Sequence, residues 1–287
     1  MQKVSPLIFV GMHRSGTTMT SKFLDAINVF MGYRVGKVNN EAYYFQYLNE
    51  WILAQHGCSW DNPESYYFTN TLVQNEIIRV LKKEMKGRRK FDFLGFRKSL
   101  KFTSIEDLNF SWGWKDPKTS ITLDLWLKVF PNAKILHIVR HPIDVANSLS
   151  KREKELKGNF RKKNELRELE SKLSHKPLYQ QSVRVEHIEE GIKLWSYYVS
   201  SIVKHTKSLD EKQILTIRYE DILASPIPCL EKIGLFVNER KQSKEFLLNF
   251  SKEIDASRAF AFKQSKNLIQ YENFLESNVE CHKLFGY

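Results

Sequence analysis

A short apolar run that leads into a loop rich in glycine and hydroxyl residues is the strongest constraint on the fold of this chain. The run covers residues 7–10 (LIFV), and the loop covers residues 11–18 (GMHRSGTT). Apolar residues then recur at helical spacing from Met19 to Ile27. A strand, a loop and a helix in this order predict a parallel α/β unit whose loop meets a ligand.

The loop has the composition of an anion-binding site. Backbone N–H groups at a helix N-terminus attract negative charge. Gly11 and Gly16 allow the backbone to approach an anion closely. Ser15, Thr17 and Thr18 add hydroxyl donors. These residues together predict a cradle for a phosphate or a similar group.

One position separates this loop from the loops that bind ATP and GTP. The spacing nearly matches G-x-x-x-x-G-K-[ST], but Thr17 occupies the place of the lysine, and the cation of the loop is Arg14. In nucleotide-hydrolysing P-loops that lysine contacts the phosphates, and the following hydroxyl binds Mg²⁺. The departure therefore disfavours a triphosphate site and favours an anion site that works without a metal.

A second anion site is predicted after the strand at residues 134–140 (KILHIVR). His141-Pro142 breaks this strand, and a helix follows. Arg140 ends the strand and Ser148 falls on the helix, so a guanidinium and a hydroxyl could hold one phosphate together. Two anion sites at the carboxyl ends of parallel strands predict a nucleotide that carries two separate phosphates.

Strands alternate with helices along most of the chain. Further strands are predicted at residues 111–114 and 214–219, and further helices at 117–130 and 222–236. The pattern predicts an α/β fold that is P-loop-like and three-layered, with a central, mainly parallel sheet flanked by helices. With no Gly/Ser linker, the 287 residues are expected to form a single domain over 1–287.

Three segments stand apart from this alternation. Residues 39–78 hold nine aromatic residues between Tyr43 and Phe68 and predict a helical aromatic cap with a turn near 61–63. Those rings either line an acceptor pocket or form the cap's own core. Residues 79–101, with ten Lys/Arg and two Asp/Glu, predict either a site for an anionic acceptor or a solvated face. Residues 151–176 predict an exposed charged insert.

The excess of positive charge widens the choice of partners, and other features narrow it. The 45 Lys+Arg and 33 Asp+Glu give a net charge of +12, which suits nucleic acid, acidic lipid or an anionic small molecule. No zinc finger, homeodomain or RNP signature is present, so nucleic acid is not expected. Three scattered cysteines, no apolar run of about 18 residues and no room for a signal peptide predict a cytoplasmic protein without a transmembrane helix.

Four stretches give the chain a resemblance to the sulfotransferase family that uses 3′-phosphoadenosine 5′-phosphosulfate (PAPS). They are GMHRSGTT, WKDPKTS, ILHIVRHPIDVANSLSKR and LTIRYEDILASP, in the family's order, spanning residues 7 to about 236. The overall pattern is similar to the bacterial branch of glycan and tyrosyl type. The resemblance implies metal-free, in-line transfer of a sulfuryl group from PAPS to a hydroxyl acceptor. A glycan (acidic ones included), a tyrosyl group or a small alcohol would suit.

The resemblance also implies which residues bind the nucleotide. Those that match the loop for the 5′-phosphosulfate are Arg14, Ser15, Gly16, Thr17 and Thr18. Arg140 and Ser148 match the pair for the 3′-phosphate, and Arg152 matches a further basic contact. Tyr219 matches a residue near the adenine, with a core tyrosine at the end of a strand as the alternative. The C-terminal loop that closes over the nucleotide has no clear motif here.

Two catalytic roles complete these expectations. Arg14, then Lys115, is the expected cation for the charge that grows on the leaving nucleotide. A surface lysine at a helix start is the alternative for Lys115. The acceptor must lose a proton, and Glu41 matches the family's glutamate base. His56 and Glu50 stay open as alternatives to Glu41.

Two other enzyme or binding classes also stay open. A P-loop kinase of a small metabolite would need ATP and magnesium, and Thr17 disfavours it. A basic nucleic-acid-binding protein fits the charge but lacks a binding signature. A sulfotransferase-like protein that only binds is disfavoured because the matched residues are all retained.

Overall fold

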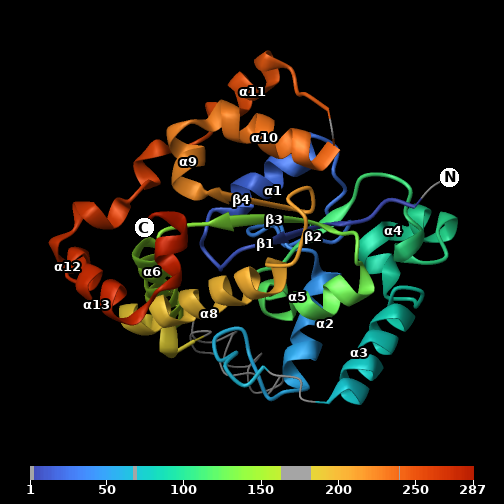
Figure 1. The fold of residues 1–287 in the computed structure, drawn as a ribbon, viewed down its shortest axis with the longest axis horizontal. Coiled ribbons are helices and arrows are strands. Elements are labelled where there is room, and N and C mark those ends of the chain that lie inside the picture. The colour runs from blue at the N-terminus through green and yellow to red at the C-terminus, as the bar shows by residue number, and fades with distance from the viewer. Residues whose placement is uncertain (1–2, 67–69, 163–181, 239) are drawn as a thin grey trace. The chain divides into compact units, whose positions relative to one another are not determined.

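A four-stranded parallel sheet organises the larger part of this computed structural model, which describes residues 3–66, 70–162, 182–238 and 240–287 (Figure 1). The strand order is β2-β1-β3-β4. The strands are β1 (Leu7–Val10), β2 (Gly113–Lys115), β3 (Lys134–Val139) and β4 (Ile214–Arg218). All three pairings are parallel. The predicted strands are therefore confirmed, with β2 shifted slightly along the chain.

The central strands are apolar along their whole length because both faces of the sheet are covered. Every residue of β1 is buried, as are Ile135 to Val139 of β3. Strand β1 pairs with β2 on one side and β3 on the other, which places the loop after Val10 in the middle of the sheet. The run LIFV thus belongs to the core and positions the loop.

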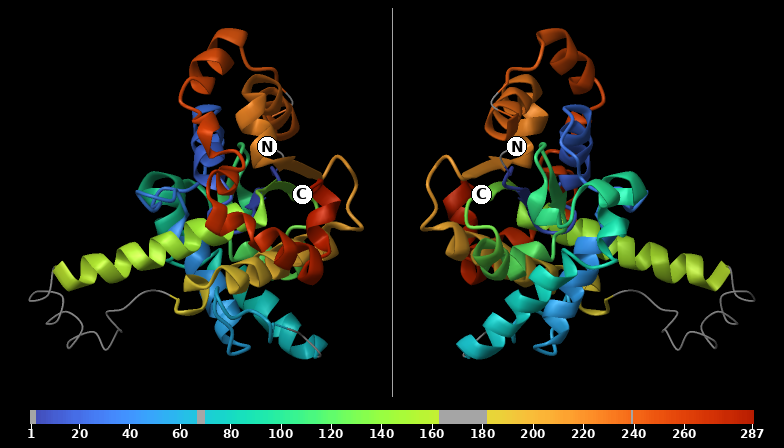
Figure 2. Two further views of the ribbon diagram at one scale, coloured as in Figure 1. Left: turned by 90° about the vertical axis from the view of Figure 1, so that its left-hand side faces the viewer. Right: turned by 90° about the vertical axis from the view of Figure 1, so that its right-hand side faces the viewer.

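One layer of helices packs on one face of the sheet. These helices are α1 (Thr17–Ala26), α9 (Tyr219–Ala224), α10 (Pro226–Asn238) and α11 (Lys244–Ser251). Phe23 and Leu24 of α1 share a buried cluster with Ile222, Leu230 and Leu247 from the other three helices. Figures 1 and 2 show α10 and α11 on this side, above the sheet.

A second layer packs on the opposite face and is rich in aromatic side chains. Its helices are α2 (Tyr43–Ala54), α3 (Thr71–Glu84), α4 (Lys90–Lys101) and α5 (Thr119–Val129). The ring of Phe45 from α2 stacks on Trp114 of β2 at 4.0 Å, and Trp126 of α5 packs against both. The predicted α/β fold with three layers and a central parallel sheet is confirmed.

Contacts divide the chain into two compact units. One comprises Met1–Arg140 with Tyr197–Ala259 and contains the sheet and the eight helices named above. The other comprises His141–Ser196 with Phe260–Tyr287. Its helices are α6 (Pro142–Lys162), the first part of α8 (Ile188–Thr206), α12 (Lys266–Ile269) and α13 (Tyr271–Asn278). The single domain over residues 1–287 stays a prediction.

The structure adds detail to three of the predicted segments. In the described part of segment 39–78, α2 and the first part of α3 are helical, and a Ser59–Asn62 bridge closes a turn between them, near the turn predicted at 61–63. The predicted helix 222–236 is two helices, because Pro226 begins α10. In the predicted insert 151–176, α6 continues to Lys162, and residues 163–176 lie outside the described residues.

Nothing in the described ranges could cross a bilayer as a helix: every helix there is too short or too polar.

Candidate functional site

The carboxyl ends of the parallel strands bring several predicted site residues to one edge of the sheet. Strand β1 ends at Val10 and continues into the loop, and its Phe9 lies in register with Lys115 at the end of β2. Arg140 follows β3, and Tyr219 follows β4. Ligands of parallel α/β sheets bind at this edge. The register therefore supports one site made from all four strand ends.

The loop of residues 11–18 presents the N-terminus of α1. Gly16 takes the left-handed conformation (φ 81°) that begins the helix, and no described side chain caps it. Gly11 N donates to Ser120 Oγ at 3.2 Å, which ties the loop to α5. Ser15 Oγ is buried and has no hydrogen-bond partner among the described residues. Uncapped N–H groups and a buried hydroxyl suit an anion that supplies the missing acceptors.

Tyr219 contacts the loop and the core at once. A Cβ atom at Gly16 would lie 2.2 Å from the Tyr219 ring, so glycine is required for the ring to cover the loop. The tyrosine is buried within the core cluster. Tyr219 is thus a core residue that also lies against the loop, and its place near the adenine stays a prediction.

Arg140 contacts the backbone of the loop. Its Nη1 donates to the carbonyl of Arg14 at 3.3 Å, and its Nη2 donates to the carbonyl of Arg258 at 3.0 Å. The guanidinium also lies 5.0 Å from the centroid of the Tyr219 ring. The Arg14 backbone takes a positive φ of 69°, and its side chain is exposed. The C-terminal region therefore reaches the site at Arg258, where the sequence offered no motif.

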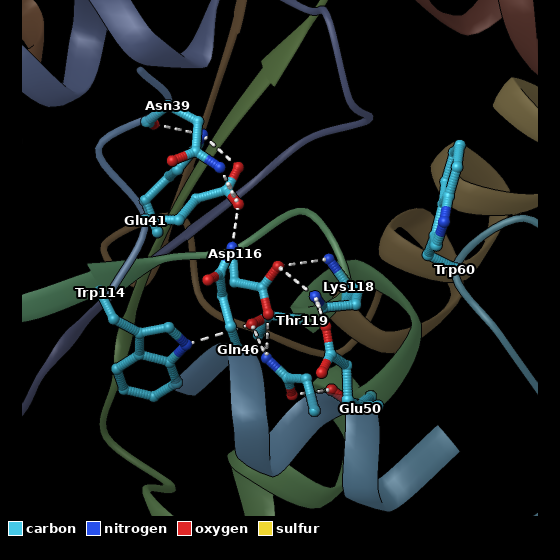
Figure 3. Close-up of polar contacts among 12 residues, drawn as sticks. Asn39, Glu41, Gln46, Glu50, Trp60, Trp114, Asp116, Lys118 and Thr119 are labelled. Carbon is cyan, nitrogen blue, oxygen red and sulfur yellow. Dashed lines mark hydrogen bonds and ion pairs between the residues drawn. The ribbon is translucent and has the colours of Figure 1, made fainter. Parts of the chain in front are cut away.

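A buried ion pair joins Glu41, which Figure 3 labels, to Lys115. Lys115 Nζ lies 2.7 Å from Glu41 Oε1 and donates to the carbonyl of Asn39 at 2.8 Å. Glu41 Oε2 accepts from Asn39 Nδ2 at 2.6 Å and from Gln46 Nε2. Lys115 is 3 % exposed, so the alternative of a surface lysine is wrong.

The environment of Glu41 makes it a better proton acceptor than an exposed carboxylate. Burial raises its pKa, and the positive charge of Lys115 offsets this only in part. A raised carboxyl pKa brings a general base closer to neutral pH, where proton transfer is most efficient. The geometry and the pKa thus agree with the role that the resemblance implies.

A tight turn holds Glu41 near the helix that follows the loop. Gly36 N donates to the Glu41 carbonyl at 2.9 Å, and Asn40 takes a left-handed φ of 54°. Asparagine tolerates that conformation better than most residues. Asn40 Nδ2 donates to Ser21 Oγ of α1 at 2.9 Å. The turn is therefore tied to the same helix whose N-terminus the loop presents.

Lys118 and Asp116 form a second charged group beside this pair, which sequence reasoning missed (Figure 3). Lys118 Nζ lies 2.9 Å from Glu50 Oε1 and 3.9 Å from Asp116 Oδ1. Burial lowers the pKa of Lys118, but the carboxylates of Asp116, Glu50 and Glu41 outweigh burial and raise it. Asp116 and Lys118 both belong to the stretch WKDPKTS, in which only Lys115 was predicted to have a role.

Asn49 joins α2 to α5 at the centre of the same network. Its Nδ2 donates to Asp116 Oδ2 and to Thr119 Oγ1, each at 2.8 Å. Its Oδ1 accepts from Thr122 Oγ1 and Trp126 Nε1, each at 2.7 Å. The amide is fully buried and uses all of its hydrogen-bonding capacity. One asparagine in a helix carries no sequence signal for such a role.

The structure places the two alternative bases differently from Glu41. The Glu50 side chain is 67 % exposed and pairs with Lys118 instead of Lys115. His56 follows α2 and packs its ring 5.3 Å from that of Tyr66. Glu41 is therefore the member of the three that the structure joins to Lys115. Its role as the base stays a proposal.

Ser148 and Arg152 lie on α6, in the second unit. Ser148 is half-buried, and Arg152 donates from Nε and Nη2 to Glu153 Oε1 at 2.9 and 2.7 Å. Within the same unit, Asp144 Oδ1 accepts from Phe262 N at 2.9 Å, which anchors the C-terminal segment to α6. The roles of Ser148 and Arg152 in nucleotide binding stay predictions.

The aromatic cap divides between core and surface. Tyr44 and Phe45 are buried, whereas Tyr43 and Tyr47 on the same helix are 48 % and 45 % exposed. The Trp60 ring packs edge-on against the ring of His13 in the loop, with the ring centroids 5.0 Å apart. The core interpretation therefore holds for the buried rings, and the exposed tyrosines remain available to a ligand.

Comparisons with known proteins give one family match. The model of a family described as the sulfotransferase family matches residues 6–240. No curated protein matches the sequence.

Solved structures similar to this chain include three from bacterial or biosynthetic sources. They are a sulfotransferase domain from the curacin biosynthetic pathway (16 % identity, 97 % of this chain and 100 % of that chain, TM-score 0.49), a sulfotransferase domain from the Synechococcus PCC 7002 olefin synthase (16 % identity, 97 % and 97 %, TM-score 0.48), and a sulfotransferase from Alicyclobacillus acidocaldarius (14 % identity, 91 % and 96 %, TM-score 0.45).

Proposed function

Because this chain belongs to the sulfotransferase family, we propose that it moves a sulfuryl group from PAPS to a hydroxyl acceptor, with Glu41 as the general base. It is a sulfotransferase enzyme. The observation that carries the proposal is the juxtaposition at the sheet edge. The uncapped N-terminus of α1 follows β1, and the buried pair of Glu41 and Lys115 lies at the end of the neighbouring strand β2.

The residues of the loop fit the phosphosulfate end of the nucleotide. The helix N-terminus offers backbone donors, and the buried Ser15 hydroxyl lacks a partner among the described residues. The side chains of Thr17 and Thr18, at the first helical positions, supply further donors. The lysine of an ATP-binding loop is missing, so the loop fits a sulfated monophosphate better than a triphosphate.

Arg140 fits the 3′-phosphate of the same nucleotide. It follows β3, next to the strand that carries the loop, and its guanidinium already contacts the loop backbone. Tyr219 lies against the loop at Gly16 and fits the adenine. Ser148 and Arg152 stay proposed contacts of that phosphate on the family resemblance alone. An arginine fork suits phosphate better than a point charge.

The reaction needs one proton acceptor and one stabiliser of negative charge. The acceptor oxygen forms a bond to sulfur while the bond from sulfur to the bridging phosphate oxygen breaks, and the acceptor proton moves to Glu41. Negative charge grows on the leaving phosphate, where Lys115 and Arg14 stabilise it. Lys115 ends strand β2 and its ammonium contacts Glu41, so in this proposal one residue connects the proton acceptor with the site of the leaving phosphate. No metal is needed for these steps.

The acceptor is proposed to be a hydroxyl compound with an apolar or ring-shaped body. Tyr43 and Tyr47 are exposed on the helix that follows Glu41, and aromatic faces pack well on sugar and phenol rings. A glycan, a tyrosyl group or a small alcohol fits this arrangement, and the cations of residues 79–101 favour an acidic glycan among them.

Calorimetric binding of 3′-phosphoadenosine 5′-phosphate (PAP), the desulfated product, tests the proposal against ATP with magnesium. We expect PAP to bind tightly and ATP with magnesium not to bind. ATP binding without PAP binding would identify a kinase loop and overturn the proposal. Once an acceptor gives turnover, EDTA should leave the rate unchanged, and a lost rate would contradict the metal-free mechanism.

A further inference from the structure

We infer that the outer face of α4 is a docking surface for membranes that contain anionic lipid. This inference does not rest on the proposed reaction, although the cations of the surface lie within residues 79–101, which also favour an acidic acceptor. The surface, here called the α4 patch, consists of four exposed apolar side chains and the cations around them. The apolar members are Tyr33, Phe91, Phe96 and Leu100, which are 68, 36, 68 and 69 % exposed.

A break in α4 creates this patch. Gly95 takes a non-helical conformation (φ 71°, ψ 172°) inside the helix. In an uninterrupted helix, Phe96 and Leu100 would follow Phe93 at i+3 and i+7 and share its buried face. Instead Phe93 is buried, Phe96 and Leu100 face solvent, and Ser99 takes the buried place. The backbone thus turns two large apolar side chains outward and a small polar one inward.

The apolar side chains of the patch lie together. The rings of Phe91 and Phe96 are 6.1 Å apart. A Cβ atom at Gly95 would lie 2.9 Å from the Tyr33 ring, which places that ring over the break in the helix. Leu100 follows Phe96 by one helical turn. Grouped exposed apolar residues mark an interaction site, whereas single ones are normal on a surface.

Positive charge surrounds these apolar residues. Residues 86–101 hold seven Lys/Arg and one acidic residue, Asp92, and Arg34 already neutralises that carboxylate at 2.5 Å. Arg97 and Lys101 are exposed on the segment after the break, beside Phe96 and Leu100. Arg89 lies over the exposed ring of Tyr47 at 3.8 Å from its centroid. An anionic partner is therefore required.

A lipid surface fits this combination better than the other anionic partners. Apolar side chains inserted at the acyl boundary, with Lys/Arg beside the headgroups, are the features of interfacial helices. The aromatic members of the patch would also stack on the bases of a single-stranded nucleic acid, but Leu100 would not, and binding to an oligonucleotide is therefore tested beside the vesicles. A second copy of the chain would bring one basic patch against another around a two-fold axis, and like charges would repel.

Vesicle co-sedimentation of the full chain tests the inference. We expect binding to phosphatidylcholine vesicles that contain about 30 mol % phosphatidylserine and none to pure phosphatidylcholine. The double variant Phe96→Ser/Leu100→Ser should weaken binding by about tenfold or more. The double variant Arg97→Glu/Lys101→Glu should do the same.

Matched controls separate the patch from general effects. Leu248→Ser removes an exposed apolar side chain on α11 (50 % exposed), and Lys207→Glu/Lys252→Glu makes the same change in net charge elsewhere. Both should bind like the wild type, and PAP binding should be unchanged in every variant, which reports on the fold.

Three results would overturn the inference. The first is either no binding to the anionic vesicles or binding that none of the patch variants weakens. Binding that depends on Arg97 and Lys101 but not on Phe96 and Leu100 is the second, because it would show a charged surface without apolar insertion. The third is patch-dependent binding to a different partner. This would be either a self-association that Phe96→Ser/Leu100→Ser abolishes or a tighter affinity for heparin or an oligonucleotide than for vesicles.

Discussion

The ammonium of Lys115 lies 2.7 Å from Oε1 of Glu41, and both side chains are buried. The residues stand 74 positions apart, so the pair forms only when β2 and the turn before α2 pack together. A buried ion pair adds little net stability, but removing one partner leaves an uncompensated charge. Changes at either residue therefore report on the site and on the fold at the same time.

Replacement of Glu41 by glutamine tests its role as the base. The amide keeps the shape of the side chain but cannot take a proton at working pH. We expect PAP affinity to stay at the wild-type value and turnover to fall by about 10²–10⁴-fold. Calorimetry and initial rates measure the two effects. Glu50→Gln is the matched control, since its carboxylate pairs with Lys118 and should be dispensable. Wild-type turnover in Glu41→Gln would remove Glu41 as the base.

The pH dependence of turnover follows from the environment of Glu41. Burial raises its pKa, so kcat should fall as the pH drops through that raised value, because the base becomes protonated. Lys115 lowers the pKa of Glu41, and Lys115→Met removes this effect. The acid limb of the rate profile should then move to higher pH. An unchanged acid limb in Lys115→Met would mean that another group controls the profile.

The same substitution predicts a pH dependence of stability. Breaking a buried pair costs about 3–5 kcal/mol of unfolding free energy. A carboxyl whose pKa is raised on folding favours the folded state when it is protonated, and this contribution is lost as the pH rises through the folded value. Lys115→Met should therefore be least destabilised, relative to wild type, at acid pH. Urea unfolding at several pH values measures the difference.

Arg140 is predicted to bind the nucleotide and to hold the loop. Arg140→Gln removes the guanidinium beside the carbonyls of Arg14 and Arg258. Truncating one member of a charged pair with phosphate costs at least about 2 kcal/mol, so PAP affinity should fall by about 30-fold or more. Arg258→Gln is the control, because it keeps the backbone carbonyl to which Arg140 donates. Equal losses in both variants would assign the effect to the Arg258 side chain or to the fold.

Gly16 and Tyr219 are predicted to depend on one another. Gly16→Ala places a Cβ atom 2.2 Å from the Tyr219 ring, at a backbone φ of 81°. We expect a large loss of both stability and PAP binding. Tyr219→Ala in the Gly16→Ala background removes the clash but leaves the backbone strain of about 1–2 kcal/mol. A double-mutant cycle should therefore give a favourable coupling, and additive effects would contradict the contact.

The strands and the loop were predictable because their signals are local. LIFV and KILHIVR are continuous apolar runs, and strands buried on both faces produce that pattern. The glycine spacing of the loop and the departure at Thr17 are also contained in a few neighbouring residues. The boundary between α9 and α10 was missed because a short apolar segment with proline fits one helix or two.

Most of the polar network was not predictable, because it depends on distant packing. Glu41 was named through a family resemblance, and its contact with Lys115 has no sequence signal. Lys118 was not predicted to be a site residue, because a lysine at a helix start is usually exposed. Here the carboxylates of Asp116 and Glu50 stabilise its buried positive charge. The exposed face of α4 was equally unpredictable. Helical spacing alone assigns Phe96 to the core, and the sequence does not reveal the break at Gly95 that turns it outward.

Asn49 offers the sharpest test of that network, because all four of its hydrogen bonds come from distant residues of α5 and of the segment before it. Asn49→Asp keeps the size of the side chain but places a carboxylate against Asp116 and removes the two donors. Buried like charges and lost hydrogen bonds should lower the unfolding free energy by at least about 2–3 kcal/mol. Thermal unfolding measures the loss.

Protonation of the introduced carboxylate would relieve the repulsion, so the loss in Asn49→Asp should shrink at acid pH, whereas Asn49→Ala should be destabilised at every pH. Because Asp116 lies next to Lys115 in the chain, the displaced network should also reduce turnover at unchanged PAP affinity. Wild-type stability and turnover in Asn49→Asp would mean that other contacts hold α2 and α5 together, namely the packed rings of Phe45, Trp114 and Trp126 and the pair of Glu50 and Lys118.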